Sequence, residues 1–131
     1  MSDRLPTDRA PVMRVPATPL YANAGGDIFG GWLMGQVDIA GSIPAVLRAK
    51  GRVVTVAVNH MQFIKPVYVG DMVSLYAEVA EVGRSSIAVD VEVYAERNPA
   101  APECVQVSRA RLTYVAVDGE GRPRSVDARE T

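Results

Sequence analysis

The sequence predicts an α+β domain in which an antiparallel β-sheet wraps around one long central helix. Two observations favour this class. A helical segment over 30–50 is apolar or small on every side, which is typical of a buried helix. Four strand-like runs follow it, and short turns join the early ones, so neighbouring strands should pair antiparallel. One helix and one sheet of this size form a layered domain with a single core.

The composition limits the function classes that need to be considered. The chain has 131 residues, 48% of them hydrophobic, and a formal net charge of −1. That balance predicts one globular domain and no nucleic-acid partner, because nucleic-acid binding needs a basic face. No apolar stretch is long enough to span a bilayer, so no membrane partner is expected. The polar segment 1–11 lacks the apolar centre of a secretory signal, which favours a cytoplasmic location.

The chain offers few side chains for metal binding or nucleophilic catalysis. Cys104 is the only cysteine and His60 the only histidine. A disulfide within the chain is therefore excluded, and neither a His/Cys metal site nor a Ser-His-Asp triad is expected. Chemistry in this protein should rest on carboxylates, amides and backbone dipoles, without a metal.

The segment before the helix is predicted to be mostly irregular. Residues 1–11 form a flexible arm with scattered charge. A short strand over 12–18 is limited by Pro16 and Pro19. Residues 21–27 form a loop, because asparagine and glycine favour turns.

The helix is predicted over 30–50 from the spacing of its apolar residues. Arg48 and Lys50 suit the negative C-terminal end of the helix dipole, and Gly51 is the expected cap there. Asp27 is expected to cap the amide groups at the N-terminal end. The apolar residues at near-helical spacing are Phe29, Leu33, Val37, Ala40 and Leu47.

Four strands are predicted after the helix, over 52–64, 71–82, 87–95 and 105–117. In the last strand the apolar alternation shifts by one residue, which predicts a β-bulge near Ser108–Arg109. The domain is therefore expected to occupy 12–123, and the polar residues 124–131 are expected to form a loose tail.

Asp38 is the only acidic residue between Asp27 and Asp71, and it lies inside the apolar run FGGWLMGQVDIAGSIPAVL. A buried carboxylate loses its hydration, so it needs a structural or chemical reason. The amide groups at the helix start, near Gly30 and Gly31, are suited to hold a developing oxyanion. The glycines also let a substrate approach the backbone closely.

Two motifs together resemble a known family. The first, GDIFGGWLMGQVD, contains the helix start and Asp38, and the second, VVTVAVNHMQFIKPVYVGD, contains the pattern F-x-x-P-V-x-V-G-D. With the later TYVAVD, they are similar to the hot-dog fold acyl-CoA thioesterases, most of all to the bacterial YciA-like branch. The resemblance extends over 12–123.

The resemblance implies a site made by two chains. In that family the helix carboxylate, here Asp38, is catalytic, and a loop asparagine, here Asn23, acts with it from the other chain. A homodimer is the minimal unit, and family members commonly assemble as trimers of dimers. CoA is bound by the strand after the helix and by a later turn, which here are Val56, Ala57, Val58, Arg84, Ser85, Ser86 and Ile87.

A dimer also fits the spacing within the helix. Asp38 lies about two turns from Gly30 and Gly31, roughly 11 Å along the helix axis. A carboxylate and an oxyanion site that act on one carbon should lie closer than this. We therefore expect the helix start of one chain to face Asp38 of its partner. The alternative is an aspartate that is hydrogen-bonded across an interface without any chemistry.

The sequence departs from the family pattern at three positions. Gly25 replaces a second asparagine, Asn59 stands where relatives usually carry an acid, and His60 is atypical. All three are expected to border the acyl and CoA site and to affect substrate preference more than reaction type.

The resemblance implies an acyl-CoA thioesterase that hydrolyses acyl-CoA to free CoA and a carboxylic acid. Asp38 acts either as general base or as nucleophile, and Asn23 and the helix start polarise the thioester. No cofactor is implied, because coenzyme A is part of the substrate and product. Two alternatives stay open: an enoyl-CoA hydratase of the same fold, with His60 beside Asp38, and a non-enzymatic acyl-CoA-binding domain.

Overall fold

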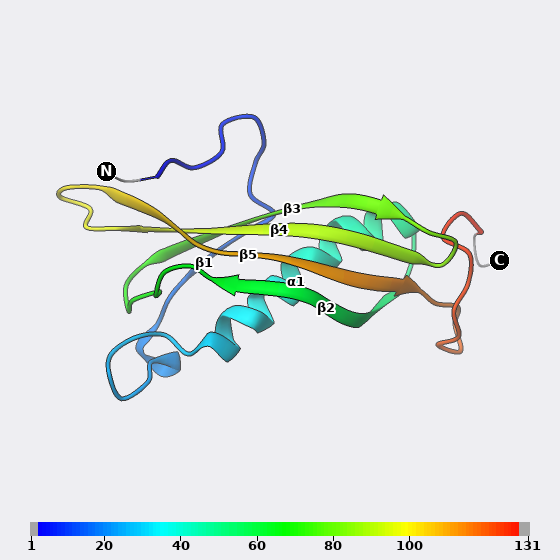
Figure 1. The fold of residues 1–131 in the computed structure, drawn as a ribbon, viewed down its shortest axis with the longest axis horizontal. Helices are drawn as coiled ribbons and strands as arrows, with labels where there is room; N and C mark the ends of the chain where they lie inside the picture. The colour runs from blue at the N-terminus through cyan, green and yellow to red at the C-terminus, as the bar shows by residue number, and fades with distance from the viewer. Residues whose placement is uncertain (1–2, 129–131) are drawn as a thin grey trace.

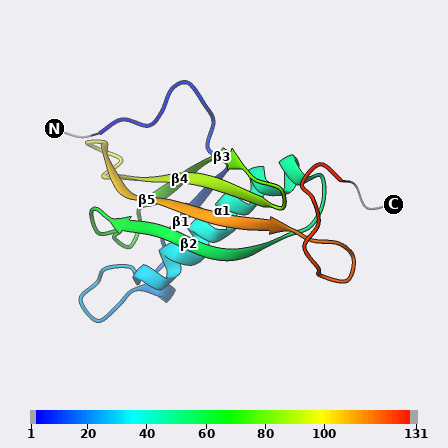
Figure 2. The ribbon, with the colours of Figure 1, turned by 45° about the vertical axis from the view of Figure 1, so that its right-hand side comes forward.

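The computed structural model describes residues 3–128 and confirms the predicted fold class. Five strands form one sheet in the order β1-β3-β4-β5-β2, with every neighbouring pair antiparallel. The long helix crosses one face of this sheet (Figure 1), and the turned view keeps it on that same face (Figure 2). In chain order the elements are β1 Met13–Pro16, the 3₁₀ turn η1 Pro19–Tyr21, α1 Gly30–Ala49, β2 Val53–Phe63, β3 Met72–Val82, β4 Ser86–Arg97 and β5 Glu103–Ala116.

The helix α1 confirms the predicted span, but only one of its faces is buried in the single chain. Its buried residues, such as Leu33 and Val37, face the sheet. On the other side Ile39 is 53% exposed and Leu47 is 73% exposed. The prediction of burial all round is therefore wrong for one chain alone, and an apolar helix face is left open.

Both predicted caps of α1 are wrong. The helix begins after Phe29, which makes no side-chain capping bond, while Asp27 lies outside it in a β-bridge with Tyr68. At the other end Lys50, not Gly51, takes the left-handed conformation, with φ of 55°. A Cβ at position 51 would lie 2.8 Å from the Arg124 guanidinium, so a larger residue there would displace the end of that side chain.

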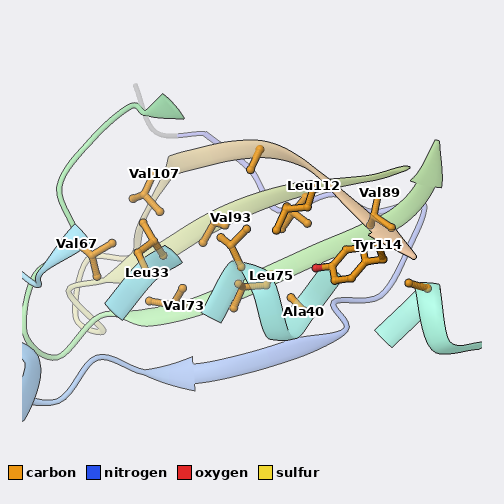
Figure 3. Close-up of a cluster of buried hydrophobic side chains, with 14 of the residues drawn as sticks. Leu33, Ala40, Val67, Val73, Leu75, Val89, Val93, Val107, Leu112 and Tyr114 are labelled. Atoms are coloured by element: carbon orange, nitrogen blue, oxygen red, sulfur yellow. The ribbon is translucent and has the colours of Figure 1, made fainter. Parts of the chain in front are cut away.

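The core lies between α1 and the inner face of the sheet (Figure 3). Along β4 burial alternates as far as Val93: Val89, Val91 and Val93 point inward and are at most 1% exposed. The predicted bulge in β5 is present, one residue earlier than expected. Val93 pairs with Ser108 and Tyr94 with Gln106, which leaves Val107 as the extra residue.

The edge strand β2 carries two irregularities of its own. Its pairing with β5 shifts between Thr55 and Ala57, and again between Val58 and His60. Val56 and Asn59 are therefore the extra residues. Bulges re-aim side chains at the edge of a sheet, and the first of these lies directly beside Asp38, as described below.

The N-terminal segment makes specific contacts with the sheet. In the arm, the Asp3 amide donates to the Cys104 carbonyl at 2.7 Å, and Arg9 pairs with Glu92 at 3.0 Å. These contacts differ from the flexible arm predicted over 1–11, of which residues 1–2 lie outside the described range.

Residues 124–128, part of the tail predicted over 124–131, make specific contacts with the helix end. Arg124 donates to the carbonyls of Ala49 and Ala128, at 2.9 and 2.6 Å, and so ties this segment to the helix end. Val126 is buried beneath it. Residues 129–131 lie outside the described range.

Within residues 3–128, no helix is long and apolar enough to cross a membrane. The same residues contain no group of three or more His, Cys, Asp or Glu side chains placed to hold a metal ion.

Candidate active site

Asp38 sits half-buried in the middle of α1, where it faces the edge of the sheet. The Thr55 hydroxyl on β2 donates to Asp38 Oδ1 at 2.6 Å. The Tyr114 hydroxyl on β5 lies 3.3 Å from the same oxygen. Thr55 and Tyr114 are directly paired across the two strands. The fold thus brings two hydroxyl groups to the carboxylate that the sequence singled out.

Tyr114 is fully buried and links the sheet to the helix backbone. Its hydroxyl donates to the Asp38 carbonyl oxygen at 2.7 Å, and Figure 3 shows this hydroxyl directed at the helix near Ala40. Burial, followed by the nearby charge of Asp38 and the hydrogen bond to it, raises the pKa of Tyr114 well above its usual range. The phenol therefore stays protonated and remains a donor.

Gly41 makes the approach of Tyr114 to the helix possible. A Cβ at this position would overlap the Tyr114 hydroxyl and would lie 3.2 Å from two ring carbons. A glycine inside a helix costs about 1 kcal/mol relative to alanine. Here the close contact between the helix and Tyr114 accounts for it.

The helix start supplies backbone donors that are not satisfied within the chain. The amides of Gly30 and Gly31 have no hydrogen-bond partner among residues 3–128. A Cβ at Gly31 would meet no atom within 4 Å, whereas Gly30 lies against the Phe63 ring. Free amides at the positive end of a helix dipole form an anion-binding site.

Asn23 organises the loop that leads into the helix. Its side-chain oxygen accepts from the amides of Gly25 at 2.9 Å and Asp27 at 3.1 Å. Among the described residues its side-chain nitrogen donates no hydrogen bond, so that group is available to a ligand. The amide of Ile28, the residue after Asp27, donates to the Val67 carbonyl at 2.8 Å.

A cavity of about 380 Å³ lies between this loop and the segment after β2. Asn23 and Gly30 both line it, together with the Phe63 ring and Val67. Asp38 does not line it, because it lies about two turns farther along α1. One chain therefore brings Asn23 and the helix start together and leaves Asp38 apart from them.

The F-x-x-P-V-x-V-G-D motif holds this cavity wall in place. Asp71 is 2% exposed and accepts from the Tyr68 amide at 2.9 Å and from Arg97 at 2.8 Å. Gly70 takes a φ of +92° in the turn before it. The motif is thus a buried, charge-paired turn behind the site rather than a set of reacting groups.

The residues predicted to bind CoA fall in two places. Val56, Ala57 and Val58 follow Thr55 on β2, beside Asp38. Ile87 on β4 pairs with Tyr114 on β5, and its side chain is fully buried in the core. Arg84 and Ser85 line a separate hollow of about 220 Å³ at the end of the sheet, and Ser86 begins β4 beside them.

Asn59 and His60 lie on the outer face of the sheet, away from Asp38. Asn59 accepts from the Thr113 hydroxyl at 2.7 Å. His60 pairs with Arg111, whose side chain binds Asp90 on that same face. Neither residue therefore lies on the Asp38 side of the sheet within one chain, and their expected place at the border of the acyl and CoA site stays a prediction. Gly25 does lie in the Asn23 loop, where its amide bonds to the Asn23 side chain.

The sequence did not single out Thr55, Tyr114 or Gly41. Their signals are weak: a tyrosine among inward-facing aliphatic residues, and one glycine among several in the helix. Only the fold shows that the three surround Asp38.

One long helix against an antiparallel sheet, with a carboxylate in mid-helix and free amides at its start, is the arrangement expected of a hot-dog fold thioesterase. Residues 25–101 match the thioesterase superfamily. The chain is 50% identical over 117 residues to an uncharacterized acyl-CoA thioester hydrolase of Haemophilus influenzae, covering 88% of this chain and 76% of the relative. It is 46% identical to the acyl-CoA thioester hydrolase YciA of Escherichia coli, covering 88% and 89%. The protein belongs to the thioesterase superfamily and, within it, to the YciA-like acyl-CoA thioester hydrolases.

Solved structures agree with this assignment. A hexameric broad-specificity acyl-coenzyme A thioesterase, solved as an aspartate-to-alanine mutant, superposes with a TM-score of 0.86 at 47% identity, covering 93% of this chain and 88% of that one. A hexameric hot-dog fold thioesterase of Campylobacter jejuni gives 0.87 at 38% identity, covering 92% of each chain. An acyl-CoA hydrolase from Staphylococcus aureus, in complex with butyryl-CoA and CoA, gives 0.80 at 30% identity, covering 86% and 68%.

Proposed function

We propose that this protein hydrolyses acyl-CoA thioesters to free CoA and a carboxylic acid. The observation that carries the proposal is the anchored carboxylate of Asp38, which lies beside an open apolar helix face and an exposed edge strand. The family of acyl-CoA thioester hydrolases to which the chain belongs supports the same reaction. No cofactor takes part, since CoA enters as part of the substrate.

In this reaction the helix start binds the thioester carbonyl. The amides of Gly30 and Gly31 hold the oxygen as negative charge develops on it, and the Asn23 side chain supports them. Asp38 either activates a water molecule that attacks the carbonyl carbon, or attacks that carbon itself to form a mixed anhydride that water then opens, restoring the carboxylate. In both routes the C–S bond breaks, and CoA leaves as a thiolate that takes up the proton released from water.

The pairing of Asn23 with Asp38 is supported by a spacing. The Staphylococcus aureus hydrolase has been solved with an asparagine replaced by alanine and with an aspartate replaced by alanine, and these two residues lie fifteen positions apart. Asn23 and Asp38 have the same separation. Because they do not share a cavity in one chain, we place them in one site that is formed by two chains.

The minimal unit is therefore a homodimer, and a trimer of dimers is the proposed assembly. The exposed apolar residues on α1 and on β2 are suited to bury one another across subunits. Hexamers are formed by the related thioesterases of known structure.

The hot-dog domain is proposed to occupy 12–123 of the chain. CoA extends from Val56–Val58 toward the Arg84–Ser86 turn, where Arg84 offers a cation for a phosphate. We place the enzyme in the cytoplasm.

The two alternatives are less well supported. A hydratase that pairs aspartate with histidine would need His60 beside Asp38, but His60 lies on the opposite face of the sheet. A non-enzymatic binding domain gives no reason for a carboxylate held by two hydroxyl groups.

The test is a thiol-release assay with acyl-CoA substrates of different chain length. Asp38→Asn is expected to lower kcat by about 10²-fold to 10⁴-fold, the usual contribution of a catalytic acid or base. Asp127→Asn, which alters an exposed carboxylate on the tail, is the matched control and should keep full turnover. Wild-type turnover in Asp38→Asn would reject the proposed function.

A further inference from the structure

We infer that Thr55 and Tyr114 are positioning residues for Asp38: Thr55 holds Oδ1, Tyr114 holds the main chain of residue 38, and Oδ2 is left as the reacting oxygen. The inference rests on the proposed function, because it assigns an atom to the proposed catalytic carboxylate. It names residues and an oxygen that the sequence did not indicate.

The hydrogen bonds to Asp38 are one-sided. Thr55 donates to Oδ1 at 2.6 Å, and the Tyr114 hydroxyl lies 3.3 Å from that same atom. Within residues 3–128 no donor reaches Oδ2. An ionised carboxylate can accept at both oxygens, so binding at one of them fixes the plane of the group and leaves the other oxygen for water or the thioester carbon. Orientation of this kind lowers the entropy that the reaction must lose.

Tyr114 fixes the main chain of residue 38 as well as its side chain. Its single hydroxyl proton goes to the Asp38 carbonyl at 2.7 Å, the shorter of the two contacts. The ring is fully buried and is wedged against Gly41, one turn along the helix. Tyr114 therefore sets how far α1 stands from the sheet at Asp38, while Thr55 makes the close contact with the carboxylate.

The sheet places Thr55 for this contact. Thr55 pairs directly with Tyr114, so the two side chains are neighbours on the inner face. The bulge at Val56 follows immediately and interrupts the alternation of the edge strand at this point. At this bulge β2 therefore carries Thr55, which points to the Asp38 side of the sheet, followed by Val56, an exposed apolar residue.

The experiment compares Thr55→Val, which keeps the shape but removes the donor, with Thr55→Ser, which keeps the hydroxyl. Thr55→Val is expected to lower kcat by about tenfold with KM for acyl-CoA changed by less than about twofold, because orientation acts on the chemical step. Thr55→Ser should recover most of the loss. In an Asp38→Asn background, Thr55→Val should have no further effect, since residues that act as a unit are not additive.

Tyr114→Phe is the second arm, with its folding checked by thermal melting. If it folds, a kcat loss that is absent in the Asp38→Asn background supports the inference. If it does not fold, the Thr55 series decides, because Thr55 is exposed and not part of the core. Full kcat in Thr55→Val beside an inactive Asp38→Asn overturns the inference and leaves the proposed function standing. Full turnover in Asp38→Asn rejects the function itself.

Discussion

The two halves of the proposed site differ in how their polar groups are satisfied. Around Asp38 the polar groups are tied down: the Thr55 hydroxyl donates to one carboxylate oxygen, and the Tyr114 hydroxyl donates to the main-chain carbonyl and lies 3.3 Å from that same carboxylate oxygen. At the helix start the polar groups are free, since the amides of Gly30 and Gly31 have no partner in the described chain. One half is restrained and the other is open.

The difference follows from what each half has to do. A carboxylate that acts on one carbon must keep one orientation, so its surroundings hold it. Amides that stabilise a charge which appears only during the reaction must be unoccupied beforehand. The two halves complement each other, yet about two helical turns separate them in one chain. In the proposed homodimer, pairing across a two-fold axis would bring each half to its counterpart.

The largest expected effect comes from mixing two inactive variants. Asp38→Ala and Asn23→Ala each disable a different half, so a mixed dimer contains one site with both residues intact. With equal co-expression and random pairing, half of the dimers are mixed, and activity should rise to about a quarter of wild type from near zero. The measurement is thiol release by the co-purified mixture.

Co-expression of two differently tagged Asp38→Ala chains is the control and should show no recovery. If the Asp38→Ala and Asn23→Ala mixture is no more active than its parents, both residues act within one chain, and the comparison between two separate halves fails.

The second prediction contrasts a glycine from each half. Gly41→Ala places a methyl group on the Tyr114 hydroxyl, so we expect a loss of about 1–3 kcal/mol in the free energy of unfolding, as in other overpacked cores, together with reduced turnover. Gly31→Ala meets no atom within 4 Å and should leave the unfolding free energy within about 0.5 kcal/mol. Its turnover should still fall by about tenfold, because the methyl group enters the space of the thioester oxygen.

Urea denaturation and thiol-release kinetics on the same preparations separate the two effects. Equal stability losses in Gly41→Ala and Gly31→Ala would show that the two halves do not differ in packing. Unchanged turnover in Gly31→Ala would argue against an oxyanion site at the helix start.

The fold was predictable because its signals are local and repeated. Along β4 every second residue is apolar, and each of these points inward. The helix caps were not predictable, because they depend on distant parts of the chain. Arg124 reaches the helix end from 75 positions away, where it donates to the Ala49 carbonyl and lies next to Gly51.

The site was predictable in part for the same reason. Asp38 stood out as a lone acid in an apolar run. Its partners did not, because Thr55 and Tyr114 lie 17 and 76 positions away and meet it only through strand register. A bulge shifts that register by one residue and so decides which side chains face inward. Nothing in the valine-rich run over 53–58 marks the bulge at Val56.

The smallest expected effects come from variants of Asp90 and His60. Both residues lie on the outer face of the sheet, outside the two halves of the proposed site, and so serve as a control for them. The hydrogen bonds from the Arg111 guanidinium hold the pKa of Asp90 below its usual value of about 3.9. A carboxyl group whose pKa is lower in the folded state stabilises the fold above about pH 3.9, and this contribution is lost as pH falls through the lowered pKa. Asp90→Asn should therefore lower the Tm slightly at pH 7, since the pair is partly exposed to solvent. The difference from wild type should shrink as the pH falls below 4, and turnover should not change at neutral pH.

His60→Gln, on the same face, should also keep wild-type turnover. A clear kcat loss in either variant would extend the site to the outer face and break the contrast between two inner halves.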